Sequence, residues 1–308
     1  AGRDNTSGIR NTALGAASMQ FNTTGEYNTA VGMQSLRDNT TGVQNTASGY
    51  RALVSNTTGN LNTASGYMAL NTNTTGSANS AHGYQALLAN TIGSSNVAMG
   101  ARALYLNLNR SNIVAIGDSA LYNNANGLGP LGPEVLEPFG YRNTAVGSKS
   151  QFLNISGYAN TALGYRSLYS NGSNSNTAVG ALALNLSSTG YGNSAIGSSS
   201  LALNTAGSEN SALGVGALGS NSSGSSNTAV GAYAGPNAAT RSNTTAIGSG
   251  ASCTQGNQVR LGNAAVSNIS GIVAFTASSD ARFKRNIQTD VHGIDFIMKL
   301  RPVTYNFD

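Results

Sequence analysis

The chain has little of what usually holds a globular protein together. Its 308 residues include no tryptophan, one cysteine, five prolines and only 9% charged side chains. The single cysteine, Cys253, excludes a disulfide framework, and we expect an inert small side chain there. The longest apolar stretches fall far short of a transmembrane span, so membrane insertion is not expected.

Charge is scarce and unevenly distributed. The net charge of +5 suggests a basic protein, but nine of the 27 charged residues lie in residues 279–308. No basic stripe with interleaved aromatic residues is present, so a nucleic-acid partner is not expected. No metal-ligand cluster, phosphate-binding loop or Ser-His-Asp set can be assembled. We therefore expect neither a metal nor a cofactor.

What the sequence has in abundance is the phrase Asn-Thr-Ala-x-Gly. Apart from one interruption, its glycine returns every 17 residues, with a single step of 16, at Gly15, Gly32, Gly49, Gly66, Gly83, Gly100, Gly117, Gly147, Gly164, Gly180, Gly197, Gly214, Gly231 and Gly248. A fixed short period is typical of a stack of equivalent coils. The chain begins within a repeat and without an initiator methionine, which indicates a fragment or a processed product.

Each repeat has the same sparse apolar pattern. The residue two places before the glycine is always alanine, which indicates close approach of neighbouring backbone or of another chain. The residue just before the glycine is mostly aliphatic, and the fourth after it is usually leucine or methionine. With a second turn at segments such as residues 22–25, each repeat is interpreted as two short strands and two turns. The predicted fold is an all-β, elongated parallel β-solenoid or β-roll.

So few apolar side chains per coil are a weak basis for a stable monomer. Pairing of several chains along one apolar ladder would remedy this, and a homotrimer is the obvious solution. We predict β-roll repeats over residues 1–117 and 143–262, a neck over 263–278 and a C-terminal segment over 279–308.

The repeat breaks once, over residues 118–142, where a Pro/Gly-rich loop is inserted. Loops extruded from a regular scaffold often carry binding residues. The candidates for receptor contact are Pro130, Pro133, Glu134, Glu137, Phe139 and Tyr141. The alternative, a spacer at a joint between two roll segments, remains open.

Two residue rows suggest further alternatives. Tyr50, Tyr67 and Tyr84 directly follow their glycines, and such a row is either packing between coils or a sugar-binding strip. Threonines also recur in phase, which leaves ice binding as an alternative, at Thr12, Thr29, Thr46 and Thr63. His82, in an otherwise aliphatic position, is interpreted as a tolerated variant.

The repeats resemble a known family. The phrases at residues 193–197 (Asn-Ser-Ala-Ile-Gly) and 245–248 (Thr-Ala-Ile-Gly) are similar to the head repeats of trimeric autotransporter adhesins. That resemblance implies left-handed parallel β-rolls, with three chains side by side around a threefold axis.

The C-terminal segment resembles a second family. Residues 279–287 (Ser-Asp-Ala-Arg-Phe-Lys-Arg-Asn-Ile) resemble the opening of the endosialidase-type intramolecular chaperone domain of phage tail fibres and tailspikes, and the matching positions include Asp280, Arg282 and Asn286. Residues 294–305 are similar to the short helix and strand that follow there, which implies a short α+β segment.

This second resemblance also implies chemistry. Chaperone domains of this kind trimerise, template folding of the fibre and often cut themselves off. Here the cleaved bond would join Ser278 to Ser279, with Ser279 as nucleophile and Lys284 as its base. The alternative is that Ser279 caps the next segment while Lys284 is a solvated charge.

Together these features predict a structural and adhesive trimeric fibre. It would be extracellular, on a phage-like tail or a bacterial surface, and would bind a cell-surface glycan or receptor. Its enzymatic activity would be autoproteolysis at most. The alternatives are an ice-binding β-solenoid and a polysaccharide-degrading tailspike.

Overall fold

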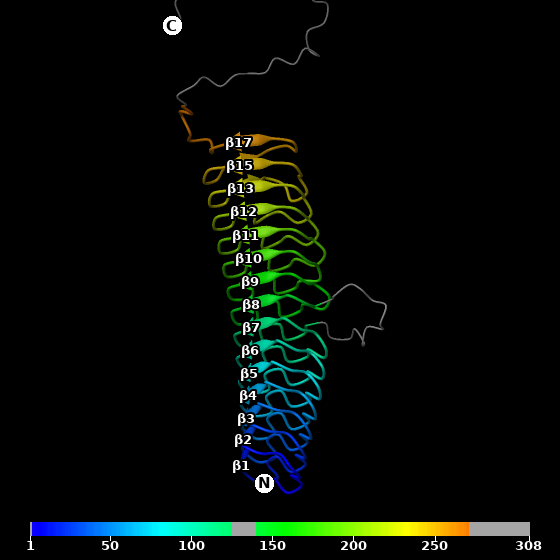
Figure 1. The fold of residues 1–308 in the computed structure, drawn as a ribbon. Coiled ribbons are helices and arrows are strands. Elements are labelled where there is room, and N and C mark those ends of the chain that lie inside the picture. Colours follow the sequence, from blue (N-terminus) through cyan, green and yellow to red (C-terminus); the bar gives the residue numbers. More distant parts are fainter. Residues whose placement is uncertain (1, 125–139, 271–308) are drawn as a thin grey trace, which may run out of the picture. The chain divides into compact units, whose positions relative to one another are not determined.

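A computed structural model describes residues 2–124 and 140–270 of the chain. Within these residues the protein is all-β, with no helix, and each repeat forms one coil of a parallel β-solenoid (Figure 1). This confirms the predicted fold class. The solenoid belongs to a compact unit, Ala1–Ala265, which is separate from a second unit, Val266–Asp308.

The strands are very short, and nearly all belong to one sheet. Fifteen of them pair in parallel, each with the strand of the next coil. The members of this main sheet are β1 (Thr12–Leu14), β2 (Thr29–Val31), β3 (Thr46–Ser48), β4 (Thr63–Ser65), β5 (Ser80–His82), β6 (Val97–Met99), β7 (Val114–Ile116), β8 (Thr144–Val146), β9 (Thr161–Leu163), β10 (Thr177–Val179), β11 (Ser194–Ile196), β12 (Ser211–Leu213), β13 (Thr228–Val230), β15 (Thr245–Ile247) and β17 (Val259–Leu261).

The expectation of two strands per coil was wrong. A second sheet exists only near the end of the described solenoid, where β14 (Gly235–Pro236) pairs with β16 (Ser252–Cys253). In the other coils, tight turns take its place. In most coils three non-glycine positions have positive φ, such as Arg51 (53°), Leu53 (52°) and Leu61 (58°). This left-handed backbone does not extend into a strand.

The register of the main sheet brings identical positions of successive repeats together. Ala30, for example, pairs with Ala47 in the next coil, and both side chains point inward and are fully buried. The leucine ladder, represented by Leu53 and Leu70, fills the rest of the apolar interior. The alanine therefore packs inside its own coil and does not mark an approach by another chain.

The interior also contains two ladders of buried asparagines. In one, Asn56 Nδ2 donates to Asn39 Oδ1 of the preceding coil at 2.8 Å and to Gly59 O at 3.0 Å. In the other, Asn45 Nδ2 donates to the same Gly59 carbonyl at 2.8 Å. Both ladders thus converge on the turn glycine. Because these amides are buried, each hydrogen bond also avoids an unsatisfied polar group.

The invariant glycine is required by the closeness of the coils. Gly66 has φ +140°, and a Cβ there would lie 2.5 Å from the carbonyl oxygen of Gly83 in the next coil. No side chain fits in this space, and few L-residues adopt this backbone conformation. The close stacking of the coils therefore accounts both for the fixed period of the repeat and for the glycine at this position.

We expect Asn56→Ala to lower the free energy of unfolding by about 2–3 kcal/mol, because Asn39 Oδ1 and Asn73 Nδ2 each lose a buried partner. Thermal and urea denaturation followed by circular dichroism would measure this. Thr58→Ala is the control, since Thr58 is exposed in the same turn. Equal stability of the two variants would contradict the role assigned to the ladder.

We expect Gly66→Ala to destabilise the solenoid by about 3 kcal/mol or more, through the clash with Gly83 and the disfavoured φ. Gly192→Ala is the matched control, because a Cβ there meets nothing closer than Glu209 Cγ at 3.7 Å. Melting temperatures would compare them, and a Gly66→Ala melting point at or above that of the control would refute the steric argument.

Candidate functional site

Most of the predicted site residues lie outside the described residues. These are Ser278, Ser279, Asp280, Arg282, Lys284 and Asn286 of the proposed cleavage segment, and Pro130, Pro133, Glu134, Glu137 and Phe139 of the inserted loop. Of the predicted receptor contacts, Tyr141 is described, and it is half-buried.

The insertion leaves the sheet intact. Strand β7 pairs directly with β8, with Val114 opposite Thr144, although the two strands are separated by the extra residues. The asparagine ladder also continues, since Asn124 Nδ2 donates to Asn107 Oδ1 and to Gly140 O, at 3.3 and 3.1 Å. The sheet and the ladder of the solenoid therefore continue without a joint from the coil that contains Asn124 to the one that contains Gly140.

The coils beside the insertion depart from the repeat. Arg110 occupies the turn position that is glycine in most coils, and its side chain is only 1% exposed. Its guanidinium carbon lies 5.5 Å from the centre of the Tyr141 ring, a cation–π contact. Among the described residues, Nε and Nη2 of Arg110 have no hydrogen-bond partner. Gln151 also replaces the core leucine, and donates from Nε2 to Thr144 O at 2.9 Å.

Sequence reasoning missed Arg110 and Gln151, although the signal was present. Both are polar residues at positions where the repeat usually has glycine or leucine, and both lie in coils close to the interruption. Alignment of the repeats in register would have found them. Arg110 contacts Tyr141 beside the inserted loop, while Gln151 is bonded inside its own coil.

The tyrosine row is a stack of rings. Tyr50, Tyr67 and Tyr84 follow one another at centroid distances of 5.3 Å with nearly parallel planes. A second stack crosses the insertion, where Tyr122 and Phe152 are 5.2 Å apart. Ring faces packed on one another are not open to a sugar ring, which needs such a face. The geometry therefore favours the packing interpretation.

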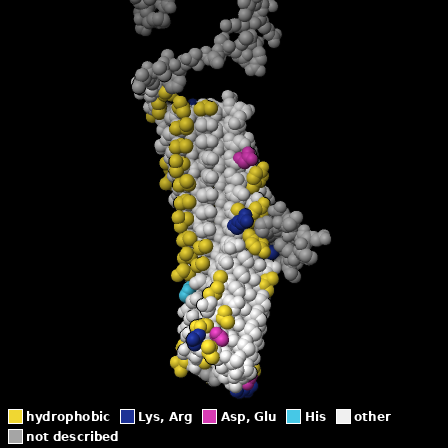
Figure 2. Space-filling model, in the orientation of Figure 1, with side chains coloured by type: hydrophobic (Ala, Val, Ile, Leu, Met, Phe, Trp, Pro, Cys, Tyr) yellow, Lys and Arg dark blue, Asp and Glu magenta, His cyan; other side chains and the backbone are white. Residues whose placement is uncertain are grey.

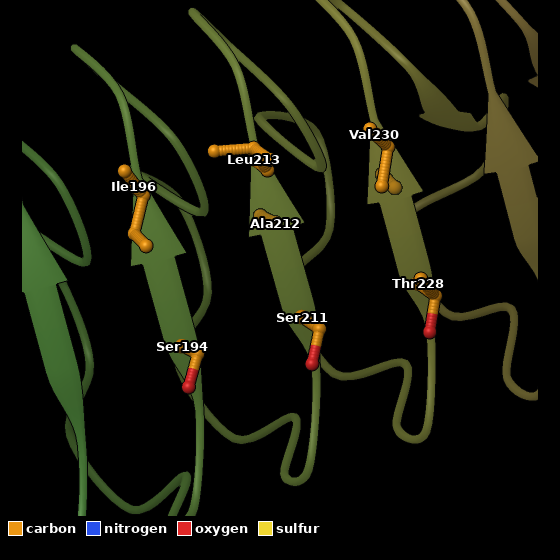
Figure 3. Close-up of a pocket in the computed structure, with 8 residues that line it drawn as sticks. Ser194, Ile196, Ser211, Ala212, Leu213, Thr228 and Val230 are labelled. Carbon is orange, nitrogen blue, oxygen red and sulfur yellow. The ribbon is translucent and has the colours of Figure 1, made fainter.

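The outer face of the main sheet carries two rows of exposed side chains. The first residue of each strand is threonine, serine or valine, and the third is mostly aliphatic. Figure 3 shows both rows in three successive coils, with Ile196, Leu213 and Val230 in one. We call the row of third residues the aliphatic ladder: Leu14, Val31, Met99, Ile116, Val146, Leu163, Val179, Ile196, Leu213, Val230, Ile247 and Leu261.

The aliphatic ladder has one interruption, the polar break. It consists of Ser48, Ser65 and His82, the third residues of β3, β4 and β5. His82 Nε2 lies 3.3 Å from Ser80 Oγ. The threonine row beside the ladder loses its regularity near the same place, passing to Ser80 and Val97. A lattice-matched ice-binding face would need a longer regular row.

Within the part of the chain that the structure describes, no group of three or more histidine, cysteine or acidic residues could hold a metal ion. The same residues contain no helix long and apolar enough to cross a membrane. Cys253 is buried, and burial raises the pKa of its thiol. The expectation that Cys253 is an inert small residue is consistent with this burial.

We expect Cys253 to react with a maleimide far more slowly in the folded chain than in urea, because burial blocks access and disfavours the reactive thiolate. Mass spectrometry after timed labelling at pH 8 would measure the difference. Equal rates in the two conditions would contradict the burial of this side chain.

Comparison with known proteins concerns the end of the chain. The family described as "Chaperone of endosialidase" matches residues 279–308, the segment beginning at Ser279. No curated protein matches the chain significantly. The chain thus combines a parallel β-solenoid of 17-residue coils with a C-terminal segment that is similar to the chaperone-of-endosialidase family.

Proposed function

We propose that this chain is the structural part of a trimeric extracellular fibre, similar to a phage tail fibre or tailspike, that matures with the help of its own C-terminal chaperone. The observation that carries this proposal is the chaperone-of-endosialidase match at residues 279–308, directly after a long solenoid. A chaperone encoded in the same chain suits a long stack of thin coils, whose coils must enter register together.

The length of the solenoid supports a structural role, in which the protein spans a distance, rather than a role in enzymatic catalysis. Fifteen parallel strands at a spacing of about 4.8 Å extend for about 70 Å. In the proposed assembly, three copies would present each surface feature three times, so that weak contacts to a glycan or receptor add up through avidity. The likeness of its coils to the heads of trimeric autotransporter adhesins belongs to the same proposal, as does display on a phage-like tail or bacterial surface.

The base of the inserted loop is the proposed place for receptor contact. The buried Arg110 guanidinium and the half-buried Tyr141 ring hold one end of the insertion against the solenoid through a cation–π contact. An anchored insertion loses less entropy on binding than a free one. Pro130, Pro133, Glu134, Glu137 and Phe139 follow as candidate contacts.

The proposed maturation step is a single peptide cleavage between Ser278 and Ser279. Ser279 Oγ adds to the carbonyl carbon of Ser278, while the neutral amine of Lys284 accepts the hydroxyl proton. The C–N bond then breaks, the amine of Ser279 takes up that proton, and an ester remains. Water hydrolyses the ester, which leaves Ser278 with a carboxylate and Ser279 with a free hydroxyl.

The test is the intact mass of the full chain beside its Ser279→Ala variant, under native and denaturing conditions. We expect a native trimer in both, a wild-type chain that ends at Ser278, and a variant that stays full length. Lys284→Arg is a second variant, which keeps the charge but removes the base and should also stay uncleaved.

Two results would overturn parts of the proposal separately. A trimer without cleavage in the wild type would remove the autoproteolysis and leave the fibre. A monomer with unchanged mass in all three chains would remove the trimeric fibre itself.

A further inference from the structure

Tyr233 is the most exposed tyrosine in the described part of the chain. It is 73% exposed, whereas the next, Tyr191, is 51% exposed. Tyr67 and Tyr84 stack on one another, but Tyr233 belongs to none of the ring stacks of the described residues. Its ring is therefore not used for packing between aromatic side chains, and it remains open to a ligand.

Glycines on both sides keep the ring of Tyr233 apart from other side chains. Gly216, Tyr233 and Gly250 occupy the same position in three successive coils, with φ of 62°, 55° and 65°. Elsewhere Gln34 and Arg51 adopt this backbone conformation at the same position, so the conformation alone does not require glycine. A Cβ at Gly216 would lie 2.7 Å from Tyr233 Cδ1 and 2.8 Å from Cε1. The missing side chain of Gly216 thus lets the ring lie against the backbone, and Gly250 has no side chain to cover it.

A hollow of about 220 Å³ adjoins this ring. It forms where small residues replace bulky ones of the repeat. Gly219 stands at the position of Tyr122 in the aromatic stack, and Gly235 stands at the position of Leu218 in the leucine ladder. Pockets for drug-sized ligands measure about 300–1,000 Å³. The smaller hollow beside Tyr233 suits a single ring-shaped group.

The backbones of the two coils are also less tightly joined at the hollow. In most earlier coils, the N–H six residues after the motif glycine donates to a carbonyl of the next coil, as Ser55 N does to Asn71 O at 3.2 Å. The corresponding bond from Ser220 N to Pro236 O is not formed. Within the described chain, the N–H of Ser220 therefore has no backbone acceptor.

Hydrogen-bonding side chains surround the hollow, which is lined by Ser220, Asn237 and Ser252 among others. Arg241 Nη1 donates to Asn237 Oδ1, and Nδ2 of that amide has no partner among the described residues. None of the residues that line the hollow is charged. Charged side chains are rare on the solenoid as a whole, as Figure 2 shows for one face. The hollow thus offers hydroxyl and amide groups beside an aromatic ring, without charge in its lining.

We propose that Tyr233, Ser220 and Asn237 form a subsite for one neutral hexopyranose unit of a glycan. The C–H face of a pyranose packs on an aromatic ring, and its hydroxyls exchange hydrogen bonds with hydroxyl and amide groups. A purely apolar ligand would bury Ser220 and Asn237 without partners, and an acidic ligand would find no cation in the lining. This inference rests on the glycan contact in the proposed function, and it adds a second contact on the solenoid, apart from the inserted loop.

Saturation-transfer difference NMR on the full chain tests the subsite. The probes are the methyl glycosides of glucose, galactose and mannose, at millimolar concentrations. Tyr233→Ala removes the ring, and Ala17 shows that alanine is accommodated at this position of the repeat. Ser220→Leu fills the hollow with a residue that the repeat already has there, at Leu203 of the preceding coil. Tyr191→Ala is the matched control, because it removes another exposed tyrosine ring outside the hollow.

After circular dichroism confirms the fold of each chain, we expect the wild type to bind at least one of the glycosides with a millimolar dissociation constant. Tyr233→Ala and Ser220→Leu should each weaken this binding about tenfold, through loss of the ring or of the space beside it. Tyr233→Phe keeps the ring and Tyr191→Ala lies elsewhere, so both should bind like the wild type.

Other outcomes overturn definite parts of the inference. Equal binding by all five chains would refute this subsite and leave glycan contact elsewhere on the fibre standing. Weaker binding in Tyr233→Ala but not in Ser220→Leu would keep the ring as a contact and refute the hollow. No binding by any chain would refute the subsite, whereas the trimer and the cleavage depend on the intact masses and would stand.

A Pro-Pro dipeptide amide is the last probe, because proline rings also pack on exposed aromatic side chains. Binding of this peptide in place of the glycosides, lost in Tyr233→Ala, would refute the sugar and assign the site to a peptide. Failure of the dipeptide to bind a chain that binds the glycosides would support the sugar.

Discussion

The structure depends on hydrogen bonds between buried asparagines of successive coils. The hydrophobic interior of a coil is little more than an alanine and a leucine, too thin to specify a fold. The amides of Asn45 and Asn56 supply what is missing, since both donate to the Gly59 carbonyl and each is bonded to an asparagine of a neighbouring coil. A partner that lies one coil away must recur at a constant distance along the chain. The constant period of the sequence is therefore a requirement of the buried amide network.

This polar interior leaves the exterior free to vary. Side chains outside the ladders differ from coil to coil, and they include stacked tyrosines and a long insertion that leaves the sheet pairing unchanged. Two of the departures from the repeat inside the coil, at Arg110 and Gln151, lie in coils close to the insertion, whereas Arg241 occupies the same turn position as Arg110 far from it. The outer face of the main sheet varies less, since none of the first and third residues of its strands is charged.

Much of the fold could be predicted because it repeats. The seventeen-residue spacing predicted coils, and the recurrence of alanine and leucine predicted ladders, both of which are present. The second strand of each coil was predicted wrongly, because turn-like Asn-Thr-Thr-Gly segments and short strands are similar in composition, and left-handed residues such as Leu53 are not recognisable from sequence. The asparagines were assigned to turns, where they are common, and their burial in the core was missed. For the candidate site, the sequence identified Tyr141 but not its partner Arg110. The two residues are distant in the sequence and come into contact only when their coils stack in the folded solenoid.

The sequence by itself determined the period, the all-β class, the positions that must be small and the family resemblance at residues 279–308. Each of these follows from residue identity at fixed spacing, which needs no three-dimensional information. Only the tertiary structure decided which side of each short strand faces inward. It placed Ala30 inside and Val31 outside, since neighbouring strand residues point to opposite faces. The interior has room for only one of two neighbouring strand side chains, and the alanine takes it. The recurring aliphatic residues therefore lie outside, where they form an exposed, uncharged ladder.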